Sequence, residues 1–313
     1  MTKYVSSMWF KGALLWLKGV LISVFAVLGL SHQALAGPVW QGQGAYKDDF
    51  LVGTLHIGDE RVESQLQSLM RLVDRVDTLV VEVDLSEISN LAQSNAVQRY
   101  ALLNEGQSLN QLISAQVRKR VDAYFNAYGL SIEQYQAFKP WMVAIIMVQL
   151  SYQELGLNSQ LGIDQQLIKY AKQQGKTVIQ LETFEFQLDM FNQLFSQNST
   201  ISYDDMLLDT LDELTQMSEL PNKMLSAWLD GDLAVFEQIY QQTLTSSTFD
   251  KALEEIIIKR RNYAWKAKLE PLLLANSVLV ATGTLHYVGQ HGLPTILKGE
   301  FVLTDQSNSQ KNQ

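Results

Sequence analysis

The tetrapeptide GTLH occupies residues 53–56 and returns at residues 283–286, 230 positions further along the chain. Each copy follows a short apolar run that is typical of a buried β-strand, FLV at 50–52 and SVLVA at 277–281. A glycine directly after a strand lets the backbone turn, or come close to another chain or a ligand. Each copy then delivers a histidine, and we expect the fold to bring these two strand ends together.

Strand and helix patterns alternate between the two copies. Residues 39–52 predict an opening hairpin, and a helix with an apolar face follows residue 59. The run TLVVEVD at 78–84 predicts an interior strand, and TVIQL at 177–181 predicts another after a helix that opens at Asp164. Strand–helix–strand order is the mark of a parallel sheet. The predicted fold is α/β, with a mixed, mainly parallel central sheet and the GxxH motifs at strand ends.

Two large helical insertions interrupt this alternation, at 90–157 and 184–269. We interpret them as parts of a single domain at 37–304, which a polar, disordered tail follows at 305–313. The strongly apolar stretch 141–150 has the length of a buried helix and is too short for a membrane span.

The N-terminus has the layout of a secretory signal peptide at residues 1–36. Three lysines precede an apolar run at 20–30, and the small-x-small sequence ALA follows at 34–36. The apolar run has 11 residues, which is short for a bilayer crossing, so we expect no stable membrane span after cleavage. An uncleaved N-terminal anchor is the alternative. The expected location is outside the cytoplasm, either periplasmic or secreted.

Charge and cysteine content exclude several classes of function. Removal of 1–36, which holds three lysines and no acidic residue, changes the formal charge from −9 to −12. So acidic a chain is a poor partner for nucleic acid or an anionic membrane. The 313 residues include no cysteine, which excludes disulfides, thiolate catalysis and thiolate metal ligands. Any metal would be held by imidazole and oxygen.

Four predicted strands end in a group that can take part in chemistry: His56, Glu82 with Asp84, Glu182, and His286. In open α/β sheets, sites form outside the carboxyl ends of parallel strands. Two imidazoles and a carboxylate can hold a divalent ion with positions left open for water or substrate. Such an ion lowers the pKa of bound water, and a spare carboxylate can move the proton.

These residues also have structural interpretations. A single histidine after a strand is most often structural, but two in identical frames favour a site. Glu82 within a buried strand needs a partner, and a salt bridge to Arg260 or Arg261 would supply one. Asp84 could be a helix cap, and His291 is interpreted as a surface residue. The sequence has no HExxH zincin helix, P-loop, GxGxxG after the first strand, or GxSxG nucleophile elbow.

In the order and spacing of these motifs, the sequence resembles the TraB/GumN family, whose animal relatives include the Tiki metalloproteases. The resemblance covers nearly all of the chain after residue 36. The matching stretches are GTLHIGD at 53–59, Glu82 with its strand, KPW at 139–141, GID at 162–164, GK at 175–176, LET at 181–183 with Gln187, RN at 261–262 with Trp265, and GTLH at 283–286 with Gly289 and Gly292.

The resemblance implies a divalent-metal site of the manganese or cobalt class, with His56, Glu82 and His286 as its ligands. For the Tiki branch it also implies peptide-bond hydrolysis. Further matched residues would surround the ligands or orient a substrate: Glu182, Arg261, Asn262, Gly53 and Gly283.

The leading hypothesis is an exported, peptidase-like hydrolase that uses Mn²⁺, Co²⁺ or Zn²⁺, with Glu182 or Asp84 moving the proton. Its substrate would be a peptide or a small molecule, and the helical insertions would form walls or a lid. The alternative is a periplasmic protein that binds or sequesters a peptide, a signal molecule or haem without turnover. A third interpretation is a scaffold that keeps the motifs for folding. The oligomeric state stays open.

Overall fold

The computed structural model describes residues 37–195, 201–216, 219–245, 247–297 and 300–304. These residues belong to one compact unit. The predicted signal peptide (1–36) and the predicted tail (305–313) lie outside the described residues.

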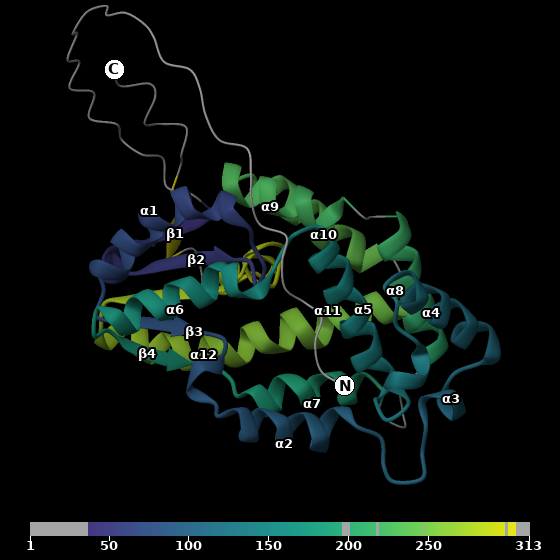
Figure 1. The fold of residues 1–313 in the computed structure, drawn as a ribbon. Coiled ribbons are helices and arrows are strands. Elements are labelled where there is room, and N and C mark those ends of the chain that lie inside the picture. Colours follow the sequence, from purple (N-terminus) through teal and green to yellow (C-terminus); the bar gives the residue numbers. More distant parts are fainter. Residues whose placement is uncertain (1–36, 196–200, 217–218, 246, 298–299, 305–313) are drawn as a thin grey trace, which may run out of the picture. The chain divides into compact units, whose positions relative to one another are not determined.

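The described residues form a six-stranded sheet with the order β4-β3-β5-β2-β1-β6 (Figure 1). The strands β4, β3, β5 and β2 run parallel to their neighbours, whereas β1 is antiparallel to both β2 and β6. The predicted mixed, mainly parallel sheet and the opening hairpin are therefore confirmed. The strand bounds are β1 (Val39–Gly42), β2 (Phe50–Thr54), β3 (Thr78–Val81), β4 (Thr177–Gln180), β5 (Val278–Gly283) and β6 (Phe301–Leu303).

Helices cover both faces of the sheet (Figure 1). Because side chains alternate along a strand, Leu79 and Val81 of β3 face one layer of helices and Val80 faces the other. The first layer contains α1 (Glu63–Asp74), α6 (Ile163–Gln173), α9 (Leu220–Asp230) and α10 (Leu233–Thr245), and the second contains α12 (Arg260–Ala275) and α13 (Leu293–Ile296). Burial on both faces explains why the strands read as continuous apolar runs.

A separate apolar core lies among the remaining helices. Trp141, Met147 and Phe125 are fully buried there, which confirms that 141–150 belongs to a buried helix. These helices are α2 (Asn90–Ala101), α3 (Leu109–Leu112), α4 (Ala115–Ala127), α5 (Pro140–Glu154), α7 (Phe184–Leu194) and α8 (Tyr203–Gln216), with α11 (Thr248–Glu254) preceding α12. Within the described ranges, no helix has the length and apolar character needed to cross a membrane.

The two GTLH copies end neighbouring strands, as the sequence predicts. Gly53 of β2 lies opposite Thr282 of β5, and Thr54 lies opposite Gly283. Because the strands are parallel, both histidines leave the sheet at the same edge. On the other side of β5, Val81 pairs with Ala281, so Glu82 arrives at this edge as well.

Asp49 joins the opposite ends of the same two strands. It is buried just before β2, and its carboxylate accepts a hydrogen bond from the backbone N–H of Val278 at 2.7 Å. Burial raises the pKa of Asp49 from its ordinary 3.8 to about 6, although the Val278 N–H opposes the shift. The native state therefore keeps this proton to a higher pH than the unfolded state does. The stability that Asp49 contributes falls as pH rises from about 4 to 6.

We expect the variant Asp49→Asn to gain stability relative to the wild type as pH rises. Its amide oxygen can still accept from Val278, but it carries no buried charge. The shift corresponds to at most about 3 kcal/mol, so the difference in unfolding free energy should change by about 1–3 kcal/mol between pH 4 and pH 7.5. Urea denaturation at both pH values measures it. The exposed Asp230→Asn serves as control, and an equal effect of Asp49→Asn at both pH values would contradict the assignment.

Candidate functional site

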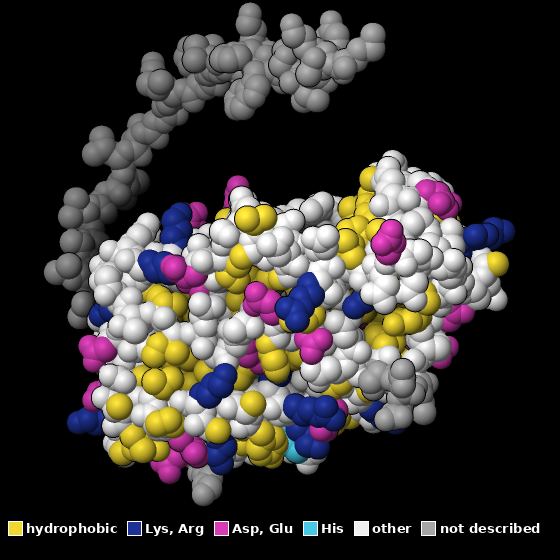
Figure 2. All heavy atoms as spheres, turned by 90° about the horizontal axis from the view of Figure 1, so that it is seen from below, with side chains coloured by type: hydrophobic (Ala, Val, Ile, Leu, Met, Phe, Trp, Pro, Cys, Tyr) yellow, Lys and Arg dark blue, Asp and Glu magenta, His cyan; other side chains and the backbone are white. Residues whose placement is uncertain are grey.

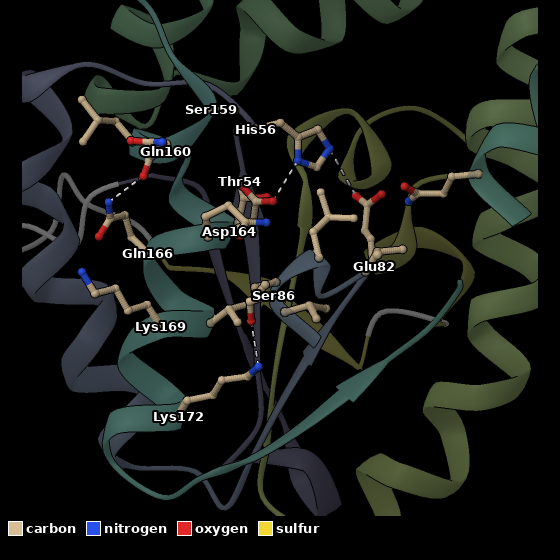
Figure 3. Close-up of a pocket in the computed structure, with 18 of the residues that line it drawn as sticks. Thr54, His56, Glu82, Ser86, Ser159, Gln160, Asp164, Gln166, Lys169 and Lys172 are labelled. Atoms are coloured by element: carbon tan, nitrogen blue, oxygen red, sulfur yellow. Dashed lines mark hydrogen bonds and ion pairs between the residues drawn. The ribbon is translucent and has the colours of Figure 1, made fainter. Parts of the chain in front are cut away.

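A cavity of about 890 Å³ opens at the carboxyl ends of the parallel strands (Figure 3). Thr54 and His56 line it from the end of β2, and Glu82 lines it from the end of β3. The helix α6 contributes side chains from Asp164 to Gln173. The site that the sequence placed at this edge of the sheet thus adjoins a volume large enough for a ligand.

His56 is the exposed histidine of the pair, with 60% of its side chain accessible to solvent. Its Nδ1 lies 3.1 Å from Oδ2 of Asp164, and its Nε2 lies 3.9 Å from Oε1 of Glu82. Partial shielding from water opposes the charged form. The charge and hydrogen bond of Asp164, together with the charge of Glu82, outweigh it and raise the pKa of His56 above its ordinary value.

The loop before α6 is docked on the first GTLH copy and brings Asp164 to His56. The Ile163 N–H donates to the carbonyl of Leu55 at 2.9 Å, and Gly58 and Asn158 form a β-bridge. A Cβ at Gly162 would lie 2.5 Å from the carbonyl oxygen of His56, so only glycine allows this approach. Sequence reasoning recognised Asp164 only as a helix start and missed its contact with His56.

His286 is the buried histidine, with a side chain only 5% exposed. Its Nδ1 lies 2.6 Å from Oδ1 of Asn262, and its Nε2 lies 3.1 Å from Nη1 of Arg261. Because a guanidinium only donates, Nε2 must accept and the ring proton lies on Nδ1. Burial and the positive charge of Arg261 lower the pKa of His286 to about 3, so the ring is neutral. Asn262 also donates to the backbone carbonyl of His286 at 3.0 Å and thereby fixes the loop.

Glu82 lies between the two histidines. Its Oε1 accepts from the Gly283 N–H at 2.7 Å and is 3.9 Å from Nε2 of both His56 and His286. Its Oε2 accepts from Nη2 of Arg261. Burial alone would raise the pKa of Glu82, but the charge of Arg261, the two histidines and the Gly283 N–H together outweigh it and lower the pKa to about 2. Glu82 is therefore an ionised acceptor directed at both imidazoles.

Arg261 connects these groups to Glu182. Its Nε and Nη2 donate to the Glu182 carboxylate at 2.8 to 3.1 Å, and its guanidinium stacks on Trp265 with 4.6 Å to the ring centroid. The side chain is 6% exposed. Of the two arginines that the sequence offered to Glu82, Arg261 forms the pair, whereas Arg260 pairs with Glu255.

Neither Glu182 nor Asp84 is among the residues that line the cavity. Glu182 also accepts from the Trp265 indole N–H at 2.8 Å, so its oxygens are well occupied. Asp84 accepts from the Ser86 N–H at 3.0 Å and pairs with Lys172 at 2.6 Å. The interpretation of Asp84 as a cap is therefore confirmed. The role of either carboxylate in proton transfer stays a prediction, and both environments favour a structural role.

Two further helices hold the GTLH loops from outside. The Trp228 indole on α9 donates to the carbonyl of Gly53 at 2.7 Å. Glu237 on α10 accepts from the N–H of Gly289, just beyond the second copy, at 2.9 Å. Both glycines of the motifs thus act through their backbones: the carbonyl of Gly53 accepts from Trp228, and the N–H of Gly283 donates to Glu82. The His291 side chain contacts Tyr263 and does not take part in this cluster, although its backbone carbonyl accepts from Asn262 at 2.7 Å.

The donors fit a divalent ion in kind and in orientation. Asp164 and Asn262 occupy the Nδ1 atoms and leave both Nε2 atoms directed at Glu82, an arrangement that is common around metal-bound histidines. With neutral imidazoles, the three carboxylates Glu82, Glu182 and Asp164 and the single guanidinium carry a net charge of −2. Across the described residues, however, no three His, Cys, Asp or Glu side chains are already close enough to hold a metal. An ion would have to replace the contact of Arg261 with His286.

Fold and site together define a class of protein: an α/β domain in which two GxxH histidines and a buried glutamate meet at the edge of a parallel sheet. Comparison with known proteins agrees with this description. The chain belongs to the TraB/PrgY/gumN family, whose family model matches residues 38–300.

The uncharacterized protein YbaP of Escherichia coli K12 is 30% identical over 248 residues, which cover 79% of this chain and 87% of YbaP. The YbaP protein of Shigella flexneri matches to the same extent. No solved structure matches the chain.

Removing the charge of Glu182 should destabilise the protein. In Glu182→Gln, the buried Arg261 loses one of its two carboxylates, and breaking such a pair costs about 3 kcal/mol. The control Glu270→Gln removes a solvent-exposed pair with Lys266 at 3.7 Å and should cost less than about 0.5 kcal/mol. Urea denaturation of both variants measures the difference. Equal costs would show that the buried pair does not contribute as its geometry indicates.

Proposed function

We propose that the protein is an exported, metal-dependent hydrolase with peptidase-like activity. The ion, Mn²⁺, Co²⁺ or Zn²⁺, would be held by His56, Glu82 and His286. The observation that carries the proposal is the convergence of two imidazole Nε2 atoms on one oxygen of Glu82, each at 3.9 Å. Export is supported by the sequence pattern at 1–36, where charged, apolar and small residues follow one another.

In this proposal the chain itself prepares the donors. Asp164 and Asn262 each hold a ring proton on Nδ1, so Nε2 of the neutral His286 is an acceptor, and Nε2 of His56 becomes one when the imidazolium loses its second proton. Arg261 keeps Glu82 ionised and, with the Gly283 N–H, fixes its orientation. An ion that binds His56 has to displace the second ring proton that the raised pKa of this histidine retains.

A bound ion of this kind would polarise a carbonyl and lower the pKa of water. The 890 Å³ cavity beside His56 would hold the substrate. We assign proton transfer to Asp164 in preference to Glu182 or Asp84. Asp164 lines the cavity, and its Oδ1 has no hydrogen-bond partner among the described residues. Arg261 and Trp265 stay on the buried side and exclude water from behind Glu82.

We expect the purified protein to bind about one equivalent of Mn²⁺, Co²⁺ or Zn²⁺ after chelator treatment. His56→Ala should weaken binding at least about a hundredfold, because it removes a ligand whose own side chain is largely exposed. His291→Ala, which removes the histidine outside the site, is the matched control and should bind as the wild type does. Calorimetric titration with elemental analysis measures both. Unchanged binding in His56→Ala, or none in the wild type, refutes the metal site.

The metal-loaded protein should cleave members of a diverse peptide library, and Glu82→Gln should reduce the rate at least about a hundredfold. Mass spectrometry of the digest measures this, and thermal unfolding confirms that the variant is folded. Metal binding without cleavage, together with a small molecule retained through purification, would instead support a ligand-binding protein without turnover.

A further inference from the structure

The cavity is lined by charged side chains of which one lacks a counter-charge. Glu82 is paired with Arg261, Asp164 with His56, and Lys172 with Asp84 and Glu87. Lys169 also lines the cavity, and it has no acidic partner within ion-pair distance in the part of the chain that the structure describes. A ligand that complements this lining should therefore bring a negative charge to Lys169.

Lys169 lies on the same helix as the residue that contacts His56. Asp164, which contacts His56, and Lys169 both project from α6 (Figure 3). They are five residues apart, and a helix rises 1.5 Å per residue, so their backbones are about 7.5 Å apart along the axis. An extended peptide covers about 3.5 Å per residue. The lysine therefore faces a group about two residues away from the one beside His56.

The lining between these points suits a peptide backbone. Beside its apolar and charged residues, the cavity is lined by amide and hydroxyl side chains, and each amide can both donate and accept. They are Gln160, Gln165, Gln166, Gln187, Ser86 and Ser159. Thr54 is also a lining residue, and its hydroxyl is fully buried and has no hydrogen-bond partner among the described residues. An unpaired buried hydroxyl is costly unless a ligand or water satisfies it.

We propose that Lys169 binds a carboxylate of the substrate, about two residues from the bond presented to His56. The proposal rests on the peptidase-like function only in taking a peptide as the ligand. The carboxylate has two possible sources: the C-terminus of a short peptide, or the side chain of an acidic residue at that position. In the first case the enzyme would release short C-terminal fragments.

Lys172 does not fill the same role. Its ammonium contacts Asp84, Glu87 and the Ser86 hydroxyl, so its donors are already used. Because Lys169 is exposed, the interaction is partly screened and should weaken as salt increases. We expect a carboxylate to gain about tenfold in affinity at low ionic strength.

The test is equilibrium dialysis of the metal-free protein, expressed from the full-length sequence, against three mixtures of N-acetylated tetrapeptides. Mass spectrometry measures how much of each peptide the protein retains. One mixture has free C-termini, one has amidated C-termini without acidic residues, and one has amidated C-termini with glutamate in the last position. Wild-type protein should retain the first or the third about tenfold better than the second. Which of the two it retains identifies the source of the carboxylate.

Lys169→Gln should lower this tenfold preference for the carboxylate-bearing peptides to less than about twofold, whereas Lys119→Gln should leave the preference unchanged. Lys119 lies on α4, is exposed and does not line the cavity. Its substitution therefore makes the same change in net charge away from the cavity. Equal retention of all mixtures by the wild type, retention of none, or a preference that survives in Lys169→Gln overturns the proposal. Since no metal is present, these outcomes are independent of whether the protein is a hydrolase.

Discussion

The buried guanidinium of Arg261 is the constraint around which the site is built. A charge so deeply buried is tolerated only when its donors are fully paired, and here the partners come from three separate strand ends: Glu82, Glu182 and His286. A single side chain thus fixes the relative positions of β3, β4 and β5 at the edge that carries the motifs. A π-helical turn, Glu255–Lys259, directly precedes α12, of which Arg261 is the second residue. Such turns shift the helix face, and they are frequent at functional sites.

The two GTLH copies show how identical sequences acquire different chemistry. His56 is largely exposed and has a carboxylate behind it, which raises its pKa. His286 is buried, has a neutral amide behind it and faces a guanidinium, which lowers its pKa. Both nevertheless direct Nε2 at Oε1 of Glu82. The repeat specifies where each imidazole emerges from the sheet, and the neighbouring helices specify its charge.

The sequence predicts the parts of this protein whose signals are local. The apolar runs, the glycine that ends each strand and the repeated GxxH frame were enough to predict the parallel sheet and to place His56, Glu82 and His286 at one edge. The sequence offers two arginines, Arg260 and Arg261, as partners of Glu82. Because Arg261 is 179 positions away from Glu82, only the packing of α12 decides which of the two reaches it. Asp164 was missed because its local context describes a helix start, whereas its contact is 108 positions away. The sequence around Lys169 gives no signal, because the importance of this lysine depends on the absence of an acidic side chain beside it in the described part of the folded chain.

The second helical insertion also positions the two GTLH motifs. Trp228 holds the backbone of the first GTLH copy, Glu237 holds the loop after the second, and Arg261 and Asn262 hold His286. All four side chains come from residues 184–269, which leave the sheet after β4 and return before β5. Displacing α9, α10 or α12 would release hydrogen bonds that position both histidines. The geometry at the strand ends is therefore a property of the sheet and the insertion together, and a sheet without that insertion would lose the contacts that hold the imidazole of His286 and the backbone of both GTLH loops.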